Sequence, residues 1–461
     1  MKILTEGNSG SLIFKFAMPM LIGNVFQQSY NIVDSIVVGR YVGKEALAAV
    51  GASFPLIFML ISFVVGVAMG TTIIISQYYG AKDMKMVKRA IETMYIVLFV
   101  ASIVVTILGI TLSGPIFRLI NLPEAVMPQA ITYFNVYLTG MIFFFGFNGI
   151  SSVLRGLGDS KTPLYFLIIS TVMNMILVML FVAVFKWGVA GAAWATVISQ
   201  AGAFITGVIY LNRTHEVVKL NSLKLVFDKS IFKKSLMIGL PTGLQQTFVS
   251  MGMLAVTRIV NGFGTDVIAA YSVAIRLDSL AGMPAMNFGA ALSTFVGQNL
   301  GANKPERVKQ GLKATFMMSG ALALFTSLVV IIFRQPLMHL FTDDAAVIAI
   351  GADYLVIVSS FYIFFSTMFV IGGVMRGAGD TLIPMFITLF SLWAIRIPVA
   401  WIMSRYFGVD GIWWSIPIAW FIGMSLSYLY YLKGNWKTKV VVRQRHSEIE
   451  EMMVDEVDLI R

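Results

Sequence analysis

Long apolar stretches alternate with short polar loops along the whole chain. An apolar stretch of about 18 or more residues is typical of a membrane-spanning helix, because lipid offers the backbone no hydrogen-bond partners. We predict twelve such helices, at residues 12–36, 46–75, 87–112, 128–152, 163–185, 189–211, 234–258, 267–297, 312–333, 347–374, 383–404 and 411–432.

The second half of the chain repeats the first. "VLRGLGDSKTP" at 153–163 returns as "VMRGAGDTLIP" at 374–384, an offset of 221 residues. "ALAAV" at 46–50 and "VIAAY" at 267–271 share this offset, as do Gln77 and Gln298, while "GVAGAAW" and "GVDGIWW" are 220 apart. Four matches in one order indicate two homologous halves of six helices each.

An even number of helices per half gives both halves the same orientation in the membrane. The predicted fold class is therefore an all-α integral membrane protein. Its twelve transmembrane helices form two six-helix lobes, related by pseudo-two-fold symmetry along the membrane normal. The predicted parts are an N-lobe (1–211), a cytoplasmic linker (212–233), a C-lobe (234–435) and a cytoplasmic tail (436–461).

Lys and Arg gather in the loops on the side that holds both termini, mainly at 82–89, 213–234, 304–313 and 433–445. The opposite loops hold few. Cytoplasmic loops are enriched in these residues, so both termini are predicted to be cytoplasmic.

Composition agrees with a membrane protein. The 461 residues are 58% hydrophobic and only 12% charged, with a mean hydropathy of +0.83. The absence of Cys excludes disulfides and thiolate metal sites, and three His without an HExxH motif leave metal hydrolysis unsupported. We attribute the net charge of +11 to the cytoplasmic loops rather than to nucleic-acid binding.

A polar stripe crosses the first predicted helix within "NVFQQSYNIVDS". Its members share one helical face about 120° wide; they are Asn24, Gln27, Gln28, Asn31, Asp34 and Ser35, with Tyr30 alongside. An ionised Asp at the centre of a membrane helix costs about 2.5–3.5 kcal/mol even on lenient scales. The stripe is therefore predicted to face a water-filled cavity or polar partners.

Other helices of the first half offer such partners: Asn148, Asn174, Thr196, Ser199 and Gln200. Amides of this kind also hold membrane helices together, and for Asn148, Ser199 and Gln200 that interpretation stays open. For Asp34 we favour function. A carboxyl in a partly dry cavity can exchange a proton, or bind Na⁺ together with Asn and Thr oxygens, and an organic cation would compete for the same charge.

The second half has no acid at the matching position, because Asp34 corresponds to Ala255. Further charges lie at or inside its predicted helices, namely Arg258, Arg276, Asp278 and Arg396. Three interpretations of Arg396 stay open: it snorkels to the interface, pairs with an acid, or lines a second-half cavity. In the first helix, Pro19 permits a kink or a hinge.

"NIVDSIVVG", "VLRGLGDSKTP", "GVAGAAWATVISQ" and "FVGQNLGA" resemble the multidrug and toxic compound extrusion (MATE) family over residues 10–433. The resemblance implies a two-lobed, V-shaped exporter of cationic amphipathic compounds in exchange for H⁺ or Na⁺. Asp34 matches the family's coupling acid, and Pro19, Tyr30, Asn174 and Thr196 match its surroundings in the DinF-like branch. This chain departs from that branch at Val178, and from the NorM-like branch at Phe365, where acids are expected.

We therefore predict a multidrug efflux antiporter, not an enzyme, with Asp34 as its ion switch. Asp34, Asn174 and Thr196 would couple the ion, H⁺ or else Na⁺, and no cofactor is expected. The cavity would be lined by Tyr30, Asn31, Gln27, Asn148, Gln200 and Arg396. The expected partners are small organic cations and membrane lipids, not nucleic acid. The protein is predicted to be a monomer in a bacterial cytoplasmic membrane.

The alternative is a lipid-linked oligosaccharide flippase of the same superfamily. Such proteins often have fourteen helices and a strongly cationic cavity, whereas twelve helices and an acidic stripe favour the exporter. A membrane-embedded enzyme would need a second catalytic group near Asp34, and a receptor or structural role would not explain the polar cavity.

Overall fold

The computed structural model describes residues 3–120, 122–214 and 225–442. These residues are almost entirely helical, which confirms the all-α fold class. Parts of the predicted linker and of the predicted tail, 215–224 and 443–461, lie outside the described residues.

The first half forms α1 (Ser9–Tyr41), α2 (Lys44–Gly80), α3 (Met84–Leu119), α4 (Met127–Thr139), α5 (Met141–Gly156), α6 (Lys161–Val178) and α7 (Gly188–Thr214). A π-helical turn, η1 (Met179–Val184), extends α6. The predicted helix at 128–152 is in fact two, α4 and α5, which bend by 49° at Gly140.

The second half forms α8 (Lys229–Val260), α9 (Thr265–Gly301), α10 (Pro305–Ile332), the short α11 (Arg334–His339), α12 (Ala345–Ser359), α13 (Tyr362–Ala378), α14 (Leu382–Leu389) and α15 (Ile397–Lys433). Short 3-10 helices, η3 (Asn261–Phe263) and η5 (Asn435–Lys439), follow α8 and α15. A π-helical segment, η4 (Phe390–Arg396), joins α14 to α15. The predicted helix at 347–374 is again a bent pair, α12 and α13, at 47°.

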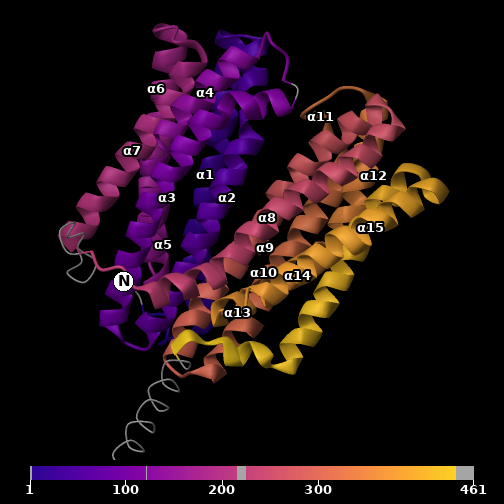
Figure 1. Cartoon of the computed structure of the whole chain (residues 1–461). Helices are drawn as coiled ribbons and strands as arrows, with labels where there is room; N and C mark the ends of the chain where they lie inside the picture. The colour runs from indigo at the N-terminus through magenta and orange to yellow at the C-terminus, as the bar shows by residue number, and fades with distance from the viewer. Residues whose placement is uncertain (1–2, 121, 215–224, 443–461) are drawn as a thin grey trace, which may run out of the picture. The chain divides into compact units, whose positions relative to one another are not determined.

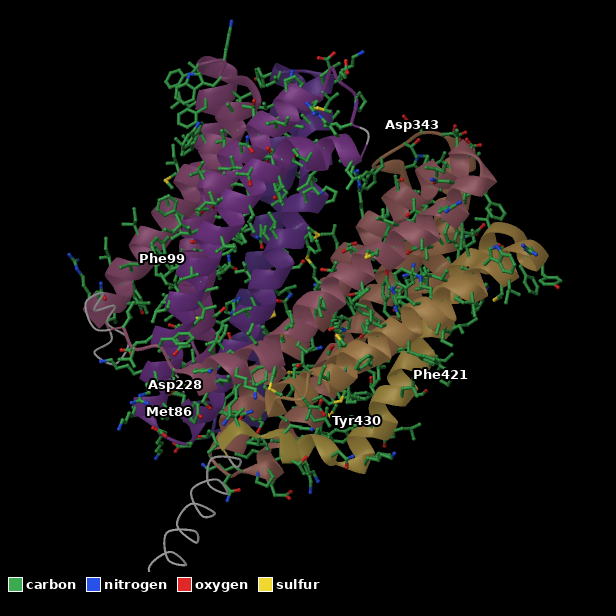
Figure 2. All side chains as sticks on the ribbon, in the orientation of Figure 1. Met86, Phe99, Asp228, Asp343, Phe421 and Tyr430 are labelled. Carbon is green, nitrogen blue, oxygen red and sulfur yellow. The ribbon has the colours of Figure 1, made fainter. Side chains whose placement is uncertain are left out.

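Within the described ranges, seven helices are long and apolar enough to cross a membrane by length and composition, and nine are when each bent pair counts as one span. The last of these, Leu382–Lys433, breaks at Gly408, where the backbone leaves the helical region. Polar residues interrupt α8 and α9, which are nonetheless 32 and 37 residues long. Large apolar side chains such as Phe99 on α3 and Phe421 on α15 are more than half exposed, as suits contact with lipid (Figure 2).

The chain divides into two compact units, each a bundle of helices (Figure 1). Unit 1 contains Met18–Gly243, and unit 2 contains Ile3–Ala17 together with the chain from Leu244 onward. The first turns of α1 thus belong to unit 2 and the first half of α8 belongs to unit 1. The division within α1 falls between Ala17 and Met18, next to Pro19.

Polar contacts hold the segment before each of these two helices. In unit 2, Leu4 N–H donates to Gln298 Oε1 (2.9 Å) and Arg307 donates to the Gly7 carbonyl (2.9 Å). In unit 1, Asp228 accepts the N–H groups of Ser230 and Ile231, and Arg89 lies 3.5 Å from its carboxylate. Asp228 thus caps α8, and the contacts of Leu4 and Gly7 anchor the segment that leads into α1.

Helices α2 and α8 approach each other closely in unit 1. A Cβ on Gly66 would lie 2.6 Å from the Gly239 carbonyl oxygen, closer than real Cβ contacts come. Only a residue without a side chain fits between these two backbones.

We expect Gly66→Ala to destabilise the protein by about 1–3 kcal/mol, because the new methyl group meets backbone that cannot rotate away. The measurement is the melting temperature of the detergent-purified protein. Gly51→Ala on the same helix is the control, since nothing lies within 4 Å of its new Cβ. Equal melting temperatures for the two variants would contradict this packing.

Candidate functional site

Asp34 is buried within unit 1, with only 8% of its surface exposed. Its Oδ1 atom is sealed from solvent and accepts no hydrogen bond from the described residues. A buried carboxyl oxygen without a partner is costly, and such groups occur mainly where a site has a further task. This observation makes Asp34 the centre of the candidate site.

Thr196 on α7 is the polar group that faces Asp34 most directly. Its hydroxyl faces both the Asp34 carboxyl and the Tyr30 hydroxyl. It also donates to the Ala192 carbonyl (3.2 Å) and accepts from Asn174 Nδ2 on α6 (3.4 Å). The predicted trio Asp34, Asn174 and Thr196 is therefore linked through one hydroxyl.

Asn174 contributes a second unused oxygen. Its amide nitrogen is engaged with Thr196, while its Oδ1 is buried without a donor among the residues described. Carboxylate, amide and hydroxyl oxygens are hard ligands of the kind that alkali and alkaline-earth ions prefer. The trio can thus hold a proton or supply three oxygen atoms to a cation.

Two tyrosines that the sequence did not single out complete the surroundings. Tyr133 and Tyr137 lie one helical turn apart on α4, with ring centroids 6.3 Å apart, and both interact electrostatically with Asp34. Gln200 faces the Tyr137 hydroxyl. Together with Tyr30, these residues place three phenol groups near the acid, and aromatic rings are groups that attract organic cations.

The remaining predicted cavity residues are less closely tied to this cluster. Asn31 is half-buried and donates to Gln28 (3.4 Å), and Gln27 is exposed. Asn148 donates to the Phe144 carbonyl of its own helix (2.9 Å). The predicted cavity role of these residues stays a prediction.

Arg396 belongs to unit 2, at the end of η4. It is buried, with 9% of its surface exposed, so it does not snorkel to the surface of the unit. It interacts electrostatically with Asp278 and Tyr271 of α9 and with Tyr354 of α12.

The internal repeat could have pointed to one of the two tyrosines on α4, Tyr133. Tyr133 and Tyr354 are related by the repeat offset of 221 residues, and each lies beside an acid of its own unit. A tyrosine at equivalent positions of both halves is a signal that charged and amide residues alone do not give.

Comparison with known proteins places this architecture in a class of membrane transporters. The MatE family model matches residues 19–180 and again residues 241–402, so the internal repeat is a property of the family model as well. The chain belongs to the MatE, or multidrug and toxic compound extrusion, family. Members of this family are transporters that need no cofactor, and they are not enzymes.

Relatives of similar length support the assignment. The probable multidrug resistance protein YpnP of Bacillus subtilis is 34% identical over 94% of this chain and 97% of its own length. The probable multidrug resistance protein NorM of Thermotoga maritima is 29% identical, over 95% of each chain. These relatives do not favour the flippase alternative, and the DinF-like branch stays a prediction.

Solved structures share the fold. A crystal structure of MATE in the straight conformation superposes with a TM-score of 0.87 at 23% identity, covering 97% of this chain and 98% of its own. A MOP-superfamily transporter from Pyrococcus furiosus also gives 0.87 at 23% identity, covering 93% and 96%. The two-lobe fold is therefore confirmed.

We expect Thr196→Val to lower the melting temperature, because the buried Asn174 amide loses its partner at a cost of about 1–3 kcal/mol. Thr206→Val on the same helix is the matched control. Thr206 is exposed and donates only to the Gly202 carbonyl one turn away (2.7 Å). If both variants melt like the wild type, the Asn174–Thr196 contact does not form.

Proposed function

We propose that this protein is an antiporter that exports cationic, amphipathic compounds in exchange for H⁺, with Asp34 as the ion switch. The observation that carries the proposal is the buried Asp34 carboxyl, whose Oδ1 lacks a hydrogen-bond partner within the described part of the chain. Binding or loss of one proton at Asp34 changes the net charge of the whole site.

The number of carboxylates supports the proton as the coupled ion. The Thr196 hydroxyl faces Asp34 and can either donate to the ionised carboxylate or accept from the protonated acid, so this contact serves both states. Na⁺ would instead require several negative oxygens, whereas Asp34 is the one carboxylate of this cluster as described.

Exchange follows from competition for one charge. When Asp34 is ionised, its carboxylate and the faces of Tyr30, Tyr133 and Tyr137 favour an organic cation. When a proton neutralises Asp34, that electrostatic attraction is lost and the cation is released. A site that cannot hold both ligands exchanges one for the other.

Alternating access requires a part that bends, and we assign that role to Pro19. Proline cannot donate to the Lys15 carbonyl, so α1 lacks one backbone hydrogen bond beside the point where the chain passes from unit 2 into unit 1. A bend there would leave the packing inside each unit unchanged.

The remaining predictions concern the cellular setting. The bacterial relatives identify a multi-pass membrane transporter of organic compounds. The enrichment of Lys and Arg on one side supports a cytoplasmic membrane protein with both termini in the cytoplasm. We propose that it acts as a monomer, because one chain supplies both compact units.

We expect Asp34→Asn to reduce gradient-driven ethidium transport by at least about tenfold, a loss of about 1.4 kcal/mol or more in transition-state terms. Transport is measured in vesicles of known orientation under a pH gradient and, separately, a Na⁺ gradient. Glu45→Gln is the control, because Glu45 is an exposed acid near the start of α2.

A response of the wild type to the Na⁺ gradient alone would correct the coupled ion while leaving Asp34 as the switch. Undiminished transport by folded Asp34→Asn would contradict the assignment of the switch. A wild type that moves no cationic dye under either gradient would contradict the proposed exporter.

The assigned hinge predicts a different defect for Pro19→Ala. Restoring the hydrogen bond stiffens α1, so the transport rate should fall several-fold while dye affinity stays within about twofold. Pro115→Ala is the control, since Pro115 is an exposed helical proline near the end of α3. Equal transport rates for both variants would rule out the hinge.

A further inference from the structure

Unit 2 contains a buried acid of its own, on α9. The Asp278 carboxyl accepts from the Tyr354 hydroxyl through Oδ2 (3.5 Å). Its Oδ1 is sealed from solvent and has no hydrogen-bond partner in the ranges that the structure covers. This is the condition of Asp34 in unit 1, reproduced by an acid on a different helix.

Four groups face Asp278 from the elements packed around it. Tyr354 and Tyr362 approach from α12 and α13, Arg396 from η4, and Tyr271 lies on α9 itself. The rings of Tyr271 and Tyr354 pack on Trp413, with centroids 5.6 and 5.0 Å away, and so are held in place. The Asp278 carboxyl therefore faces three tyrosines and one guanidinium group, and packing holds two of the tyrosine rings in place.

Arg396 is close enough to act on Asp278 but does not pair with it. No carboxylate of the described residues lies within 4.0 Å of its guanidinium. Its Nε, and the hydroxyls of Tyr271 and Tyr362, likewise make no hydrogen bond to the described residues. Several buried donors are thus poised around an acid without being satisfied.

The backbone supports the inward position of Arg396. It ends the π-helical segment Phe390–Arg396 and precedes Pro398 in the sequence. π-Helical turns inside α-helices often mark functional sites, because the extra residue redirects side chains. At the repeat offset of 221, Arg396 lies one residue from the position equivalent to Asn174.

Asp278 and Arg396 together have two possible net charges, which depend on whether Asp278 is protonated. With Asp278 ionised, the pair is neutral, although the two charges are not in contact. With Asp278 protonated, Arg396 is left as an uncompensated cation in a low-dielectric interior, where its effect on other cations is strong.

We propose that Asp278 is a second proton-binding group of this transporter and that Arg396 is its built-in counter-cation. This inference rests on the proposed exchange of organic cations for protons. Protonation of Asp278 leaves the charge of Arg396 uncompensated, so this state of unit 2 disfavours a further positive charge in that unit.

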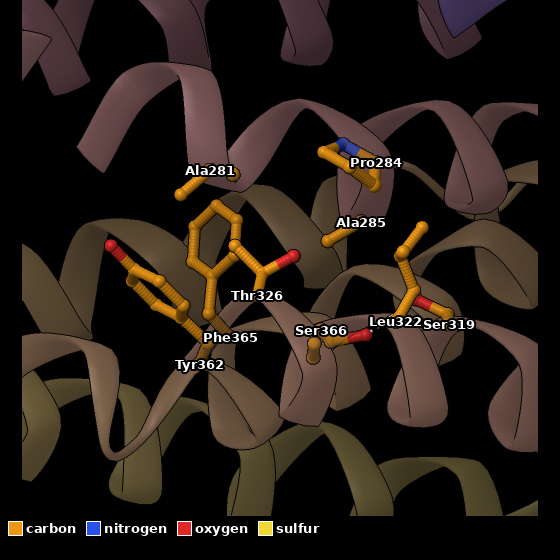
Figure 3. A pocket seen from close by; sticks show the side chains of 11 residues that line it. Ala281, Pro284, Ala285, Ser319, Leu322, Thr326, Tyr362, Phe365 and Ser366 are labelled. Carbon is orange, nitrogen blue, oxygen red and sulfur yellow. Dashed lines mark hydrogen bonds between the residues drawn. The ribbon is translucent and has the colours of Figure 1, made fainter. Parts of the chain in front are cut away.

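A small pocket with a mostly apolar lining lies beside this group. It lies between α9, α10 and α13, and Tyr362 is part of its wall (Figure 3). Thr326, Ser319 and Ser366 line the same pocket, and Ser319 and Ser366 are hydrogen-bonded to each other. These hydroxyl groups are the polar part of a mostly apolar lining, and Tyr362 belongs both to this lining and to the groups that face Asp278.

The test counts protons released when the purified protein binds tetraphenylphosphonium in weakly buffered detergent solution, at the pH of maximal release. We expect about two protons per bound cation from the wild type, and about one each from Asp34→Asn and Asp278→Asn. The double variant should release none. Asp266→Asn, which changes an exposed acid in the first turn of α9, should behave like the wild type.

Two further variants keep the test decisive if Asp278→Asn fails to fold. Asp278→Glu retains the acid and should again release two protons. Arg396→Gln removes the counter-cation, so Asp278 should stay protonated throughout and the count should fall to one.

The outcomes separate this inference from the proposed function. One proton from the wild type that is lost in Asp34→Asn but kept in Asp278→Asn would overturn the second site and leave the antiporter intact. Two protons from Arg396→Gln would overturn the role of the counter-cation. Release of no protons by the wild type would overturn the proposed proton coupling and this inference together.

Discussion

The free-energy cost of an unpartnered carboxyl group inside a membrane protein is the constraint on which the site depends. Asp34 cannot face lipid, so α1 carries a polar stripe and lies beside helices that bring Thr196, Asn174 and tyrosine hydroxyls. Even so, one carboxyl oxygen has no hydrogen-bond partner among the described residues. A protein that only needed stability would replace this acid; a transporter needs a group whose charge changes with its ligand.

Each unit contains a buried acid, but the two acids lie on helices that are not equivalent in the repeat. Each places a buried acid against tyrosine hydroxyls, and Tyr133 and Tyr354 are equivalent within the repeat. The acids themselves are not equivalent, because Asp34 lies on α1 and Asp278 on α9, and an arginine stands beside the acid of unit 2. Duplication therefore preserved the surroundings while the charges diverged.

The all-helical membrane fold and its repeat could be predicted, because lipid forces backbone hydrogen bonds to close within helices. The bends between α4 and α5, and between α12 and α13, could not, since apolar sequence continues through both. Asp34, Asn174 and Thr196 followed from the cost of polar groups. Tyr133 and Tyr137 were missed because the chain contains 16 tyrosines, and a tyrosine lacks the charge that makes an acid conspicuous in a membrane helix. Asp278 and Tyr271, which interact with Arg396, lie more than a hundred positions from it in the sequence, beyond any local pattern.

The most direct test of Asp34 as the switch is equilibrium binding of radiolabelled tetraphenylphosphonium, measured across pH for the wild type and Asp34→Asn. If a proton and the cation compete at Asp34, the wild-type dissociation constant rises as pH falls. The slope of log Kd against pH is then negative in the wild type. Its magnitude should be smaller by about one in the variant, because one competing proton is lost. An identical slope in folded Asp34→Asn would contradict the account, because the competing proton would then bind elsewhere.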